Sequence, residues 1–172
     1  MKSVAYGLLA GLFLFAAPAA AQMSVPAGLL TDVCLPYANR AQSFEKSISA
    51  ARDLEFRRPV NDRAPLEEWA SEVTLVSKDG VWQVKIEEGS VELDDGSFYV
   101  VGCTISSSRA SARQLAELGR RAFNNPLYWT SPEDNPWRWD RRSPYPDEYG
   151  LAVEVSEPPG ERPIMTVRGS YY

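Results

Sequence analysis

Residues 72–105, EVTLVSKDGVWQVKIEEGSVELDDGSFYVVGCTI, decide the fold of this 172-residue chain. Apolar and polar residues alternate along them, which is typical of strands that bury one face. The turn signals SKDG and Asp95-Gly96 separate the alternating runs. The sequence therefore predicts an antiparallel meander of about four strands, at residues 72–76, 81–87, 91–95 and 97–105. The last run is apolar on both faces, so we expect it in the middle of the sheet.

Helical patterns flank this meander along the chain. After a short mobile start at residues 22–28, residues 36–53 repeat apolar side chains with the spacing of one helical face. Residues 109–123 show the same periodicity and follow three serines that can cap a helix. Alternating runs at 151–155 and 164–168 predict a final hairpin. The order helix–meander–helix–hairpin predicts an α+β fold, with an antiparallel sheet of about four to six strands and two main helices packed on one face.

The first 21 residues have the organisation of a cleaved, Sec-type signal peptide. Lys2 gives the positive start, residues 4–15 are an uncharged apolar run, and Ala19-Ala20-Ala21 precedes Gln22. The run is shorter than the ~20 residues that a membrane-spanning helix needs. The alternative, an N-terminal core helix, does not account for the alanine run. We therefore expect residues 22–172 to form a single exported domain, periplasmic or secreted, without a transmembrane segment.

Charge and cysteine content narrow the class of protein. Loss of Lys2 leaves 17 basic and 23 acidic residues, a net charge of −6, which argues against a nucleic-acid partner. Cys34 and Cys103 are the only two cysteines. In an oxidising compartment an isolated pair predicts one disulfide, although two free buried thiols are the alternative.

The residue inventory also excludes several chemistries. The chain has no histidine, which removes Ser-His-Asp and Cys-His nucleophiles and the usual zinc ligand sets. No glycine-rich phosphate loop follows a predicted strand, so we predict no cofactor and no metal. Adjacent carboxylates remain, but neighbouring strand residues point to opposite faces and are not preset to flank one glycosidic bond. These pairs are Glu87-Glu88, Asp94-Asp95, Glu133-Asp134 and Asp147-Glu148.

Residues 125–149, NPLYWTSPEDNPWRWDRRSPYPDEY, form an aromatic and proline-rich segment that we expect to be a loop. It is either a stiff platform that presents aromatic and arginine side chains to a ligand, or a lid over the core. Ser131 and Pro132 predict a short helical turn over 132–139, in which Trp137 and Trp139 cannot share a face. We expect Trp129 in the core and one of the other two tryptophans at the surface. The candidate ligand-binding residues are Tyr128, Trp137, Arg138, Trp139, Arg141, Arg142 and Tyr145.

Arginines also gather in the second predicted helix, at positions 109, 113, 120 and 121. They are either an anion-binding patch or an ordinary solvated face on which Glu117 pairs with Arg113 and Arg121. We favour the solvated face.

Short motifs give a resemblance over roughly residues 30–120. Cys34-Leu35-Pro36-Tyr37 leads into a helix, ISAARDLEFRRP follows at 48–59, and a second cysteine lies in an apolar strand before a second helix. This arrangement resembles small periplasmic proteins of unknown function seen in alphaproteobacteria. That group commonly has glycine where Leu54 stands, and the segment after Asn125 has no counterpart in it. The resemblance implies export, a disulfide and an α+β build, and it carries over no catalytic residue.

These observations favour a non-enzymatic periplasmic binding or accessory protein. It would recognise a cell-envelope protein, glycan or lipid through the surface at residues 128–145. One alternative is a small hydrolase of envelope polysaccharide that uses paired carboxylates. Another is a structural envelope component without a ligand.

Overall fold

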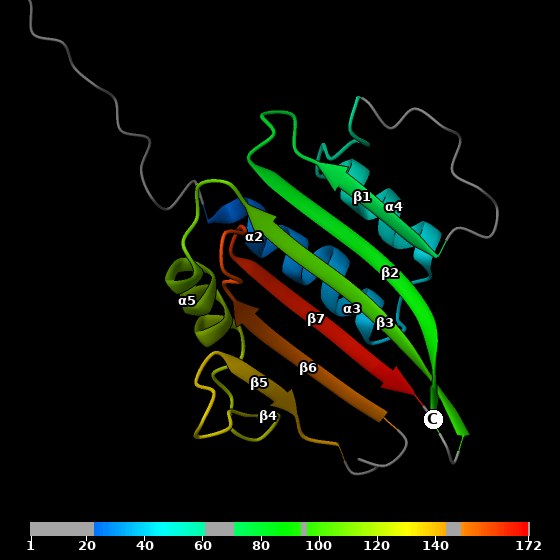
Figure 1. Ribbon diagram of the computed structural model, residues 1–172, viewed down its shortest axis with the longest axis vertical. Helices are drawn as coiled ribbons and strands as arrows, with labels where there is room; N and C mark the ends of the chain where they lie inside the picture. Colours follow the sequence, from blue (N-terminus) through cyan, green and yellow to red (C-terminus); the bar gives the residue numbers. More distant parts are fainter. Residues whose placement is uncertain (1–22, 61–70, 94–95, 144–148, 172) are drawn as a thin grey trace, which may run out of the picture.

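The computed structural model describes residues 23–60, 71–93, 96–143 and 149–171 (Figure 1). The predicted signal peptide and the candidate residue Tyr145 lie outside these ranges.

A seven-stranded, fully antiparallel sheet with the order β1-β2-β3-β7-β6-β5-β4 dominates the structure (Figure 1). The antiparallel sheet and the mixture of helix and strand agree with the prediction. The strand number exceeds the expected four to six because the aromatic segment contributes two short strands. The strands are β1 Glu72–Val76, β2 Trp82–Leu93, β3 Gly96–Ser107, β4 Trp129–Thr130, β5 Arg138–Arg141, β6 Tyr149–Ser156 and β7 Ile164–Tyr171.

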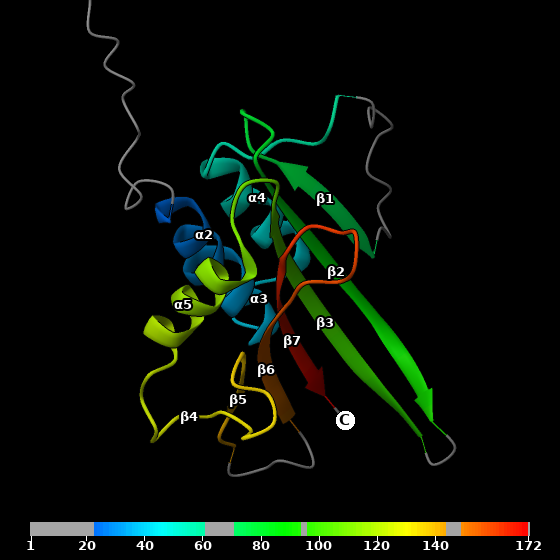
Figure 2. The ribbon, with the colours of Figure 1, turned by 60° about the vertical axis from the view of Figure 1, so that its left-hand side comes forward.

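The meander has three strands instead of the predicted four. The runs at 81–87 and 91–95 belong to one long strand, β2, because Gly89 and Ser90 continue the ladder opposite Val100 and Tyr99 of β3. The prediction that β3 is central is confirmed, since it pairs with β2 on one side and β7 on the other. The final hairpin, β6–β7, is also confirmed. Beyond the ends of β1 and β7, the β2–β3 hairpin projects as a two-stranded ribbon (Figure 2).

The chain before the meander is helical in four consecutive segments, α2 Ser24–Gly28, η1 Leu29–Cys34, α3 Leu35–Ala38 and α4 Phe44–Asp53. The single helix predicted over 36–53 is therefore wrong at its middle. Arg40 adopts a left-handed backbone conformation with φ of 54° just after α3, and Ser43 then caps α4 by accepting a hydrogen bond from the Lys46 amide. The mobile start expected at 22–28 is wrong from Ser24 onward. The residues that follow, Leu29 and Leu30, are fully buried, so burial on the sheet stabilises this region as a helix.

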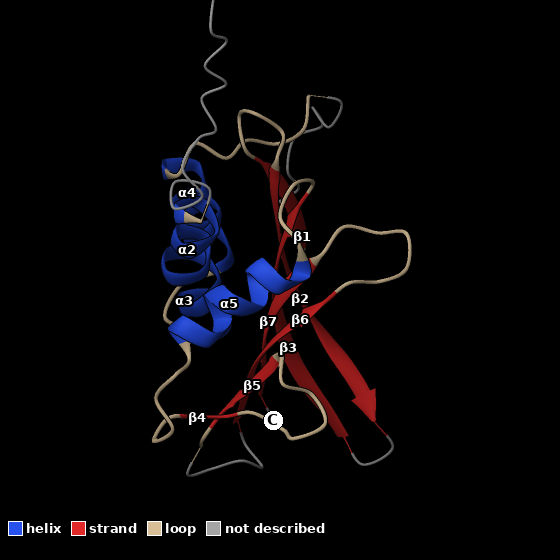
Figure 3. Cartoon of the chain, turned by 90° about the vertical axis from the view of Figure 1, so that its left-hand side faces the viewer, coloured by secondary structure: helices blue, strands red, loops and turns tan. Residues whose placement is uncertain are grey.

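The second helix, α5 Ala112–Ala122, begins three residues later than predicted. Its cap is Ser111, which forms a capping box with Gln114. Of the three serines expected to cap it, Ser107 instead accepts hydrogen bonds from the amides of Arg109 and Ala110 in the turn after β3. The helices lie on one side of the sheet, as Figure 3 shows. In the part of the chain that the structure describes, no helix is long and apolar enough to cross a membrane.

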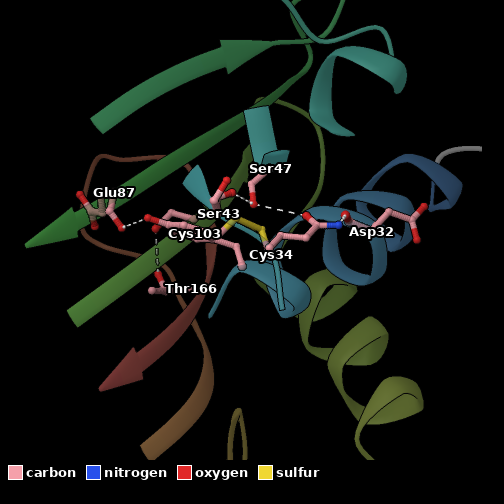
Figure 4. Close-up of a disulfide and its surroundings, with 10 residues drawn as sticks. Asp32, Cys34, Ser43, Ser47, Glu87, Cys103 and Thr166 are labelled. Atoms are coloured by element: carbon pink, nitrogen blue, oxygen red, sulfur yellow. Dashed lines mark hydrogen bonds between the residues drawn. A yellow bond between two sulfur atoms is a disulfide. The ribbon is translucent and has the colours of Figure 1, made fainter. Parts of the chain in front are cut away.

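A disulfide joins the helical layer to the centre of the sheet. Cys34 at the end of η1 is bonded to Cys103 in β3, with a Cα–Cα distance of 5.2 Å (Figure 4). This confirms the predicted pairing. The bond closes a loop of 69 residues, which in the chain-entropy model stabilises the fold by about 4 kcal/mol. Both sulfurs are fully buried in the apolar core between the two layers.

Candidate functional site

The structure does not bring together on one face those predicted ligand-binding residues that it describes, which are all of them except Tyr145. Tyr128 is exposed, as are Arg141 and Arg142, while Trp137 and Arg138 are half-buried. Trp139 is only 4% exposed and belongs to the core. Arg138 is engaged by Asp140 on the same strand, with 2.9 Å between Nη2 and Oδ1.

Trp139 is buried because α5 lies directly on it. A Cβ atom added to Gly119 would lie 2.5 Å from the Trp139 ring, so only glycine allows the helix to approach this closely. Phe123 packs on the same ring at 5.7 Å between centroids, and it contacts Trp129 at 4.4 Å. Trp129 is half-buried and not fully in the core as expected. The tryptophans of this segment therefore mainly pack between α5 and the edge of the sheet.

The helical turn predicted over 132–139 is wrong, and this error explains the misplaced Trp139. Residues 138–141 are strand β5, which pairs with β6. Pro136 disfavours helical geometry at Asn135, and the Asn135 side chain caps the following turn by accepting a hydrogen bond from the Trp137 amide. Trp137, next to the strand, also packs against the core, whereas Arg138 lies on the opposite face.

The arginines of α5 form a solvated face, as we favoured. Glu117 binds Arg121 at 3.0 Å and also pairs with Arg120, which takes the place of the predicted Arg113. These arginines hold the pKa of the Glu117 carboxyl below its usual value, the hydrogen bond from Arg121 being the main cause.

A polar pocket of about 360 Å³ lies between the α3–α4 turn and the β2–β3 hairpin. It is the strongest candidate for a functional site, and we call it the Arg40 pocket. Its charged side chains are Arg40, Glu45 and Glu88. The remaining lining residues are Tyr37, Ala41, Gln42, Ser43, Phe44, Tyr99 and Val101.

Arg40 is held over two tyrosine rings. Its guanidinium carbon lies 5.4 Å from the centroid of Tyr99 and 4.8 Å from that of Tyr171, which places a cation against two aromatic faces. No ion pair joins Arg40 to a carboxylate among the residues that the structure describes. The two rings therefore orient the guanidinium.

Glu88 provides the opposite charge and is also held by tyrosines. The Tyr37 hydroxyl donates to Glu88 Oε2 at 3.0 Å. Burial, followed by the hydrogen bond to Glu88, raises the pKa of Tyr99 to about 12. Burial likewise raises the pKa of Tyr37, only 2% exposed, well above its usual range. Both hydroxyls therefore stay protonated near neutral pH, and that of Tyr37 donates to the carboxylate.

Hydrogen bonds join the turn that carries Arg40 to the C-terminal hairpin, β6–β7. The Tyr171 hydroxyl donates to the Ala38 carbonyl, and the Tyr149 hydroxyl donates to Asn39 Oδ1 at 2.7 Å. Arg141 reaches the same oxygen at 2.9 Å, so one residue of the predicted surface supports this turn. A Cβ atom on Gly169 would lie 2.2 Å from the Ala38 carbonyl oxygen, so a glycine in β7 is required for this close approach.

A second, mostly apolar groove of about 640 Å³ lies where the β1–β2 turn and the start of α5 meet the end of α4. Its walls include Phe56, Val81 and Trp82. The Asp79 carboxylate at its rim accepts hydrogen bonds from Ser77 Oγ at 2.6 Å and the Val81 amide at 3.1 Å, within its own turn. Glu55, Lys78, Arg109 and Gln114 also line this groove, but its exposed lining is mainly apolar and Asp79 is engaged within its own turn, so we rank it below the Arg40 pocket.

Adjacent carboxylates behave as strand geometry predicts. Glu87 pairs with Lys85 at 2.6 Å on one face of β2, while Glu88 points into the Arg40 pocket on the other. Across the described ranges, no group of three acidic or cysteine side chains is placed to hold a metal ion.

Sequence reasoning missed the Arg40 pocket. Arg40 falls within the single helix predicted over 36–53, and Tyr99 within the strand predicted over 97–105. Tyr171 lies beyond the last strand predicted, which ends at residue 168. Bringing these residues together requires the register Tyr99↔Tyr171 between β3 and β7, which no local motif encodes.

Comparisons with protein-family models, with curated proteins and with solved structures find no match to this chain. The geometry of the Arg40 pocket is therefore the basis on which a function is assigned.

Proposed function

We propose that this chain is a non-enzymatic binding module that works outside the cytoplasm and recognises a cell-envelope component through the Arg40 pocket. One observation carries the proposal. A guanidinium and a carboxylate lie in the same pocket, are not joined to each other, and are each held in place by tyrosine side chains. Opposite charges fixed in this manner are prepared to bind complementary groups of a ligand.

The backbone of Arg40 supports this interpretation. A residue other than glycine in the left-handed region costs about 1–2 kcal/mol, and such residues cluster at sites where the side chain is needed. Glycine would serve better as a simple helix terminator at this position. The side chain of Arg40 therefore has a use that offsets the backbone cost, and its contacts with two rings lower the entropy lost on binding.

Export is supported by the disulfide and by the first 21 residues. A buried disulfide fits an oxidising compartment, where such bonds form and persist. The apolar run with its alanine cleavage site fits a Sec-type signal peptide, which would deliver the domain to the periplasm or the medium. The resemblance to small alphaproteobacterial periplasmic proteins points the same way.

A polysaccharide hydrolase is the second candidate, because Glu45 and Glu88 line the same pocket. Two carboxylates suffice for glycoside hydrolysis, but the general acid needs a raised pKa. The pKa of Glu45 is instead lowered, by a hydrogen bond to its own backbone and by the hydroxyl of Ser43, which donates at 2.8 Å. Glu45 is therefore unsuited to act as the general acid, and we favour binding without hydrolysis.

Binding to separated envelope fractions tests the proposal. The fractions are soluble wall fragments, lipopolysaccharide and phospholipid vesicles, each titrated into wild type, Arg40→Gly and a Tyr128→Ala/Arg142→Ala control. We expect one fraction to bind, Arg40→Gly to weaken it at least about tenfold, and the control to bind as wild type does. Absence of binding to every fraction, or loss only in the control, would reject the Arg40 pocket as the functional site. Release of reducing sugar from wall fragments, abolished by Glu88→Gln, would instead establish the hydrolase.

A further inference from the structure

We infer that the ligand group recognised by the Arg40 pocket is a zwitterionic α-amino acid unit, with its carboxylate on Arg40 and its ammonium on Glu88. This inference rests on the proposed function and specifies the chemistry of the same site. The unit is either a free amino acid or a side chain within a wall peptide that carries both groups.

The charge arrangement selects this class. A planar guanidinium binds a carboxylate through two parallel hydrogen bonds, and Arg40 is not engaged in such a pair anywhere in the described chain. Glu88 likewise has no cationic partner in the described ranges, where its carboxylate accepts a hydrogen bond from the Tyr37 hydroxyl. A ligand with only one charge would leave the other protein charge without a partner, whereas a zwitterion satisfies both.

The hydrogen-bonding capacity of Glu88 is consistent with an ammonium ligand. A carboxylate offers about four acceptor sites, and the Tyr37 hydroxyl occupies one of them. The sites that remain match the donors of an ammonium group. Tyr37 also fixes the carboxylate from the side of the core, because its ring is almost fully buried and its hydroxyl proton is shared between Glu88 Oε2 and the Glu87 carbonyl oxygen.

Pocket size and lining limit the rest of the ligand. At about 360 Å³, the pocket is at the low end of the range for small-molecule sites, which is roughly 300–1,000 Å³. Its apolar lining is restricted to Ala41, Phe44 and Val101, and the last two are nearly buried. A short aliphatic side chain, as in alanine, therefore fits this lining better than a long acyl chain or an extended glycan.

Calorimetric titration with alanine and two analogues tests the inference. Alaninamide lacks the carboxylate and N-acetylalanine lacks the ammonium. We expect each analogue to bind wild type at least about tenfold more weakly than alanine, because either the exposed Arg40 or the half-buried Glu88 loses its partner. Arg40→Gly should bind alanine and alaninamide equally, and Glu88→Gln should bind alanine and N-acetylalanine equally. Soluble wall-peptide fragments form a separate arm: tighter binding of fragments than of alanine identifies the wall peptide as the source.

Matched controls separate local from general effects. Glu87→Gln removes a neighbouring carboxylate on the opposite face of β2 and should leave alanine binding unchanged. Glu55→Gly introduces glycine at the other left-handed helix end and should also leave it unchanged. Equal binding of alanine and alaninamide to wild type would overturn the inference. If neither alanine nor wall peptides bind but another envelope fraction binds in an Arg40-dependent manner, only the ligand class is wrong. If no fraction binds, the proposed function also fails.

Discussion

The Arg40 pocket and the aromatic segment at 125–149 contain the same kinds of residue and use them in opposite ways. In the aromatic segment, the Trp139 ring is buried beneath α5, while Arg138 lies on the other face of the strand and pairs with Asp140. In the pocket, the rings of Tyr99 and Tyr171 stand beside the cation and hold it at the surface. Residue composition therefore shows which segments contain aromatic and arginine side chains. Backbone geometry decides whether the rings face the core or a ligand.

The largest effect on stability that tests this contrast is expected when the Trp139 side chain is truncated. We expect Trp139→Ala to lower the free energy of unfolding by about 3–5 kcal/mol, because it leaves a cavity between α5 and β6. Tyr128→Ala, at a side chain that is 59% exposed, should change it by no more than about 0.5 kcal/mol. Guanidinium unfolding followed by far-UV circular dichroism measures both values. Similar losses in the two variants would mean that the segment is not divided into a buried and an exposed part.

The fold was predictable where the signals are local. Alternation in residues 72–105 identifies the strands of the meander, and an isolated pair of cysteines, Cys34 and Cys103, in a chain with a predicted signal peptide indicates the disulfide. The break after α3 was not predictable, because Arg40 is not one of the residues that normally adopt a left-handed conformation. Strand β5 was missed because its residues favour strand only through pairing with β6, whereas Ser131-Pro132 locally resembles a helix start.

The candidate site was less predictable than the fold because its residues come from distant parts of the chain. Arg40 follows α3, Glu88 and Tyr99 lie on β2 and β3, and Tyr171 ends β7. A shift of one residue in strand register would turn Glu88 to the opposite face, away from Tyr37. The sequence encodes this register through the whole hydrophobic pattern and not through any short motif, so the pocket emerges only in three dimensions.

Raising the pH should lower the free energy of unfolding by an intermediate amount. This loss comes from Tyr99 in the Arg40 pocket and not from the aromatic segment. Tyr99 has a pKa of about 12 in the folded chain against a usual value of 10.0. A group whose pKa is raised by folding contributes stability that is complete below the unfolded value and is lost as pH rises toward the folded value. Between pH 10 and pH 12 the loss attributable to Tyr99 is on the order of 2 kcal/mol.

Substitution of Tyr99 by phenylalanine isolates this contribution. The stability of Tyr99→Phe should fall less steeply than that of wild type over the same pH range, as measured by urea unfolding at closely spaced pH values. Tyr128→Phe, at the exposed tyrosine of the aromatic segment, serves as the matched variant and should retain the wild-type slope. If both variants show the wild-type slope, Tyr99 is not in the desolvated, Glu88-bound state on which the pocket depends.

The smallest expected effect is the difference in stability between glycine substitutions at two helix ends. At each of these ends a residue other than glycine has a left-handed backbone conformation. Arg40 has φ of 54° and Glu55 has φ of 66°. We expect Glu55→Gly to stabilise the fold by about 0.5–1 kcal/mol, since the relief of backbone strain exceeds the added flexibility of the unfolded chain. Arg40→Gly should change stability by less than about 0.5 kcal/mol, because it also loses the contacts with two tyrosine rings.

Paired thermal and urea unfolding of these two glycine variants measures the difference. A smaller gain for Arg40→Gly than for Glu55→Gly means that the ring contacts exist in solution and hold the guanidinium before any ligand arrives. Equal gains would mean that the rings contribute nothing, and that Arg40 is a mobile surface side chain. In that case the guanidinium of Arg40 would not be held in place before a ligand binds. Arg40 would then not differ from the exposed arginines of the aromatic segment.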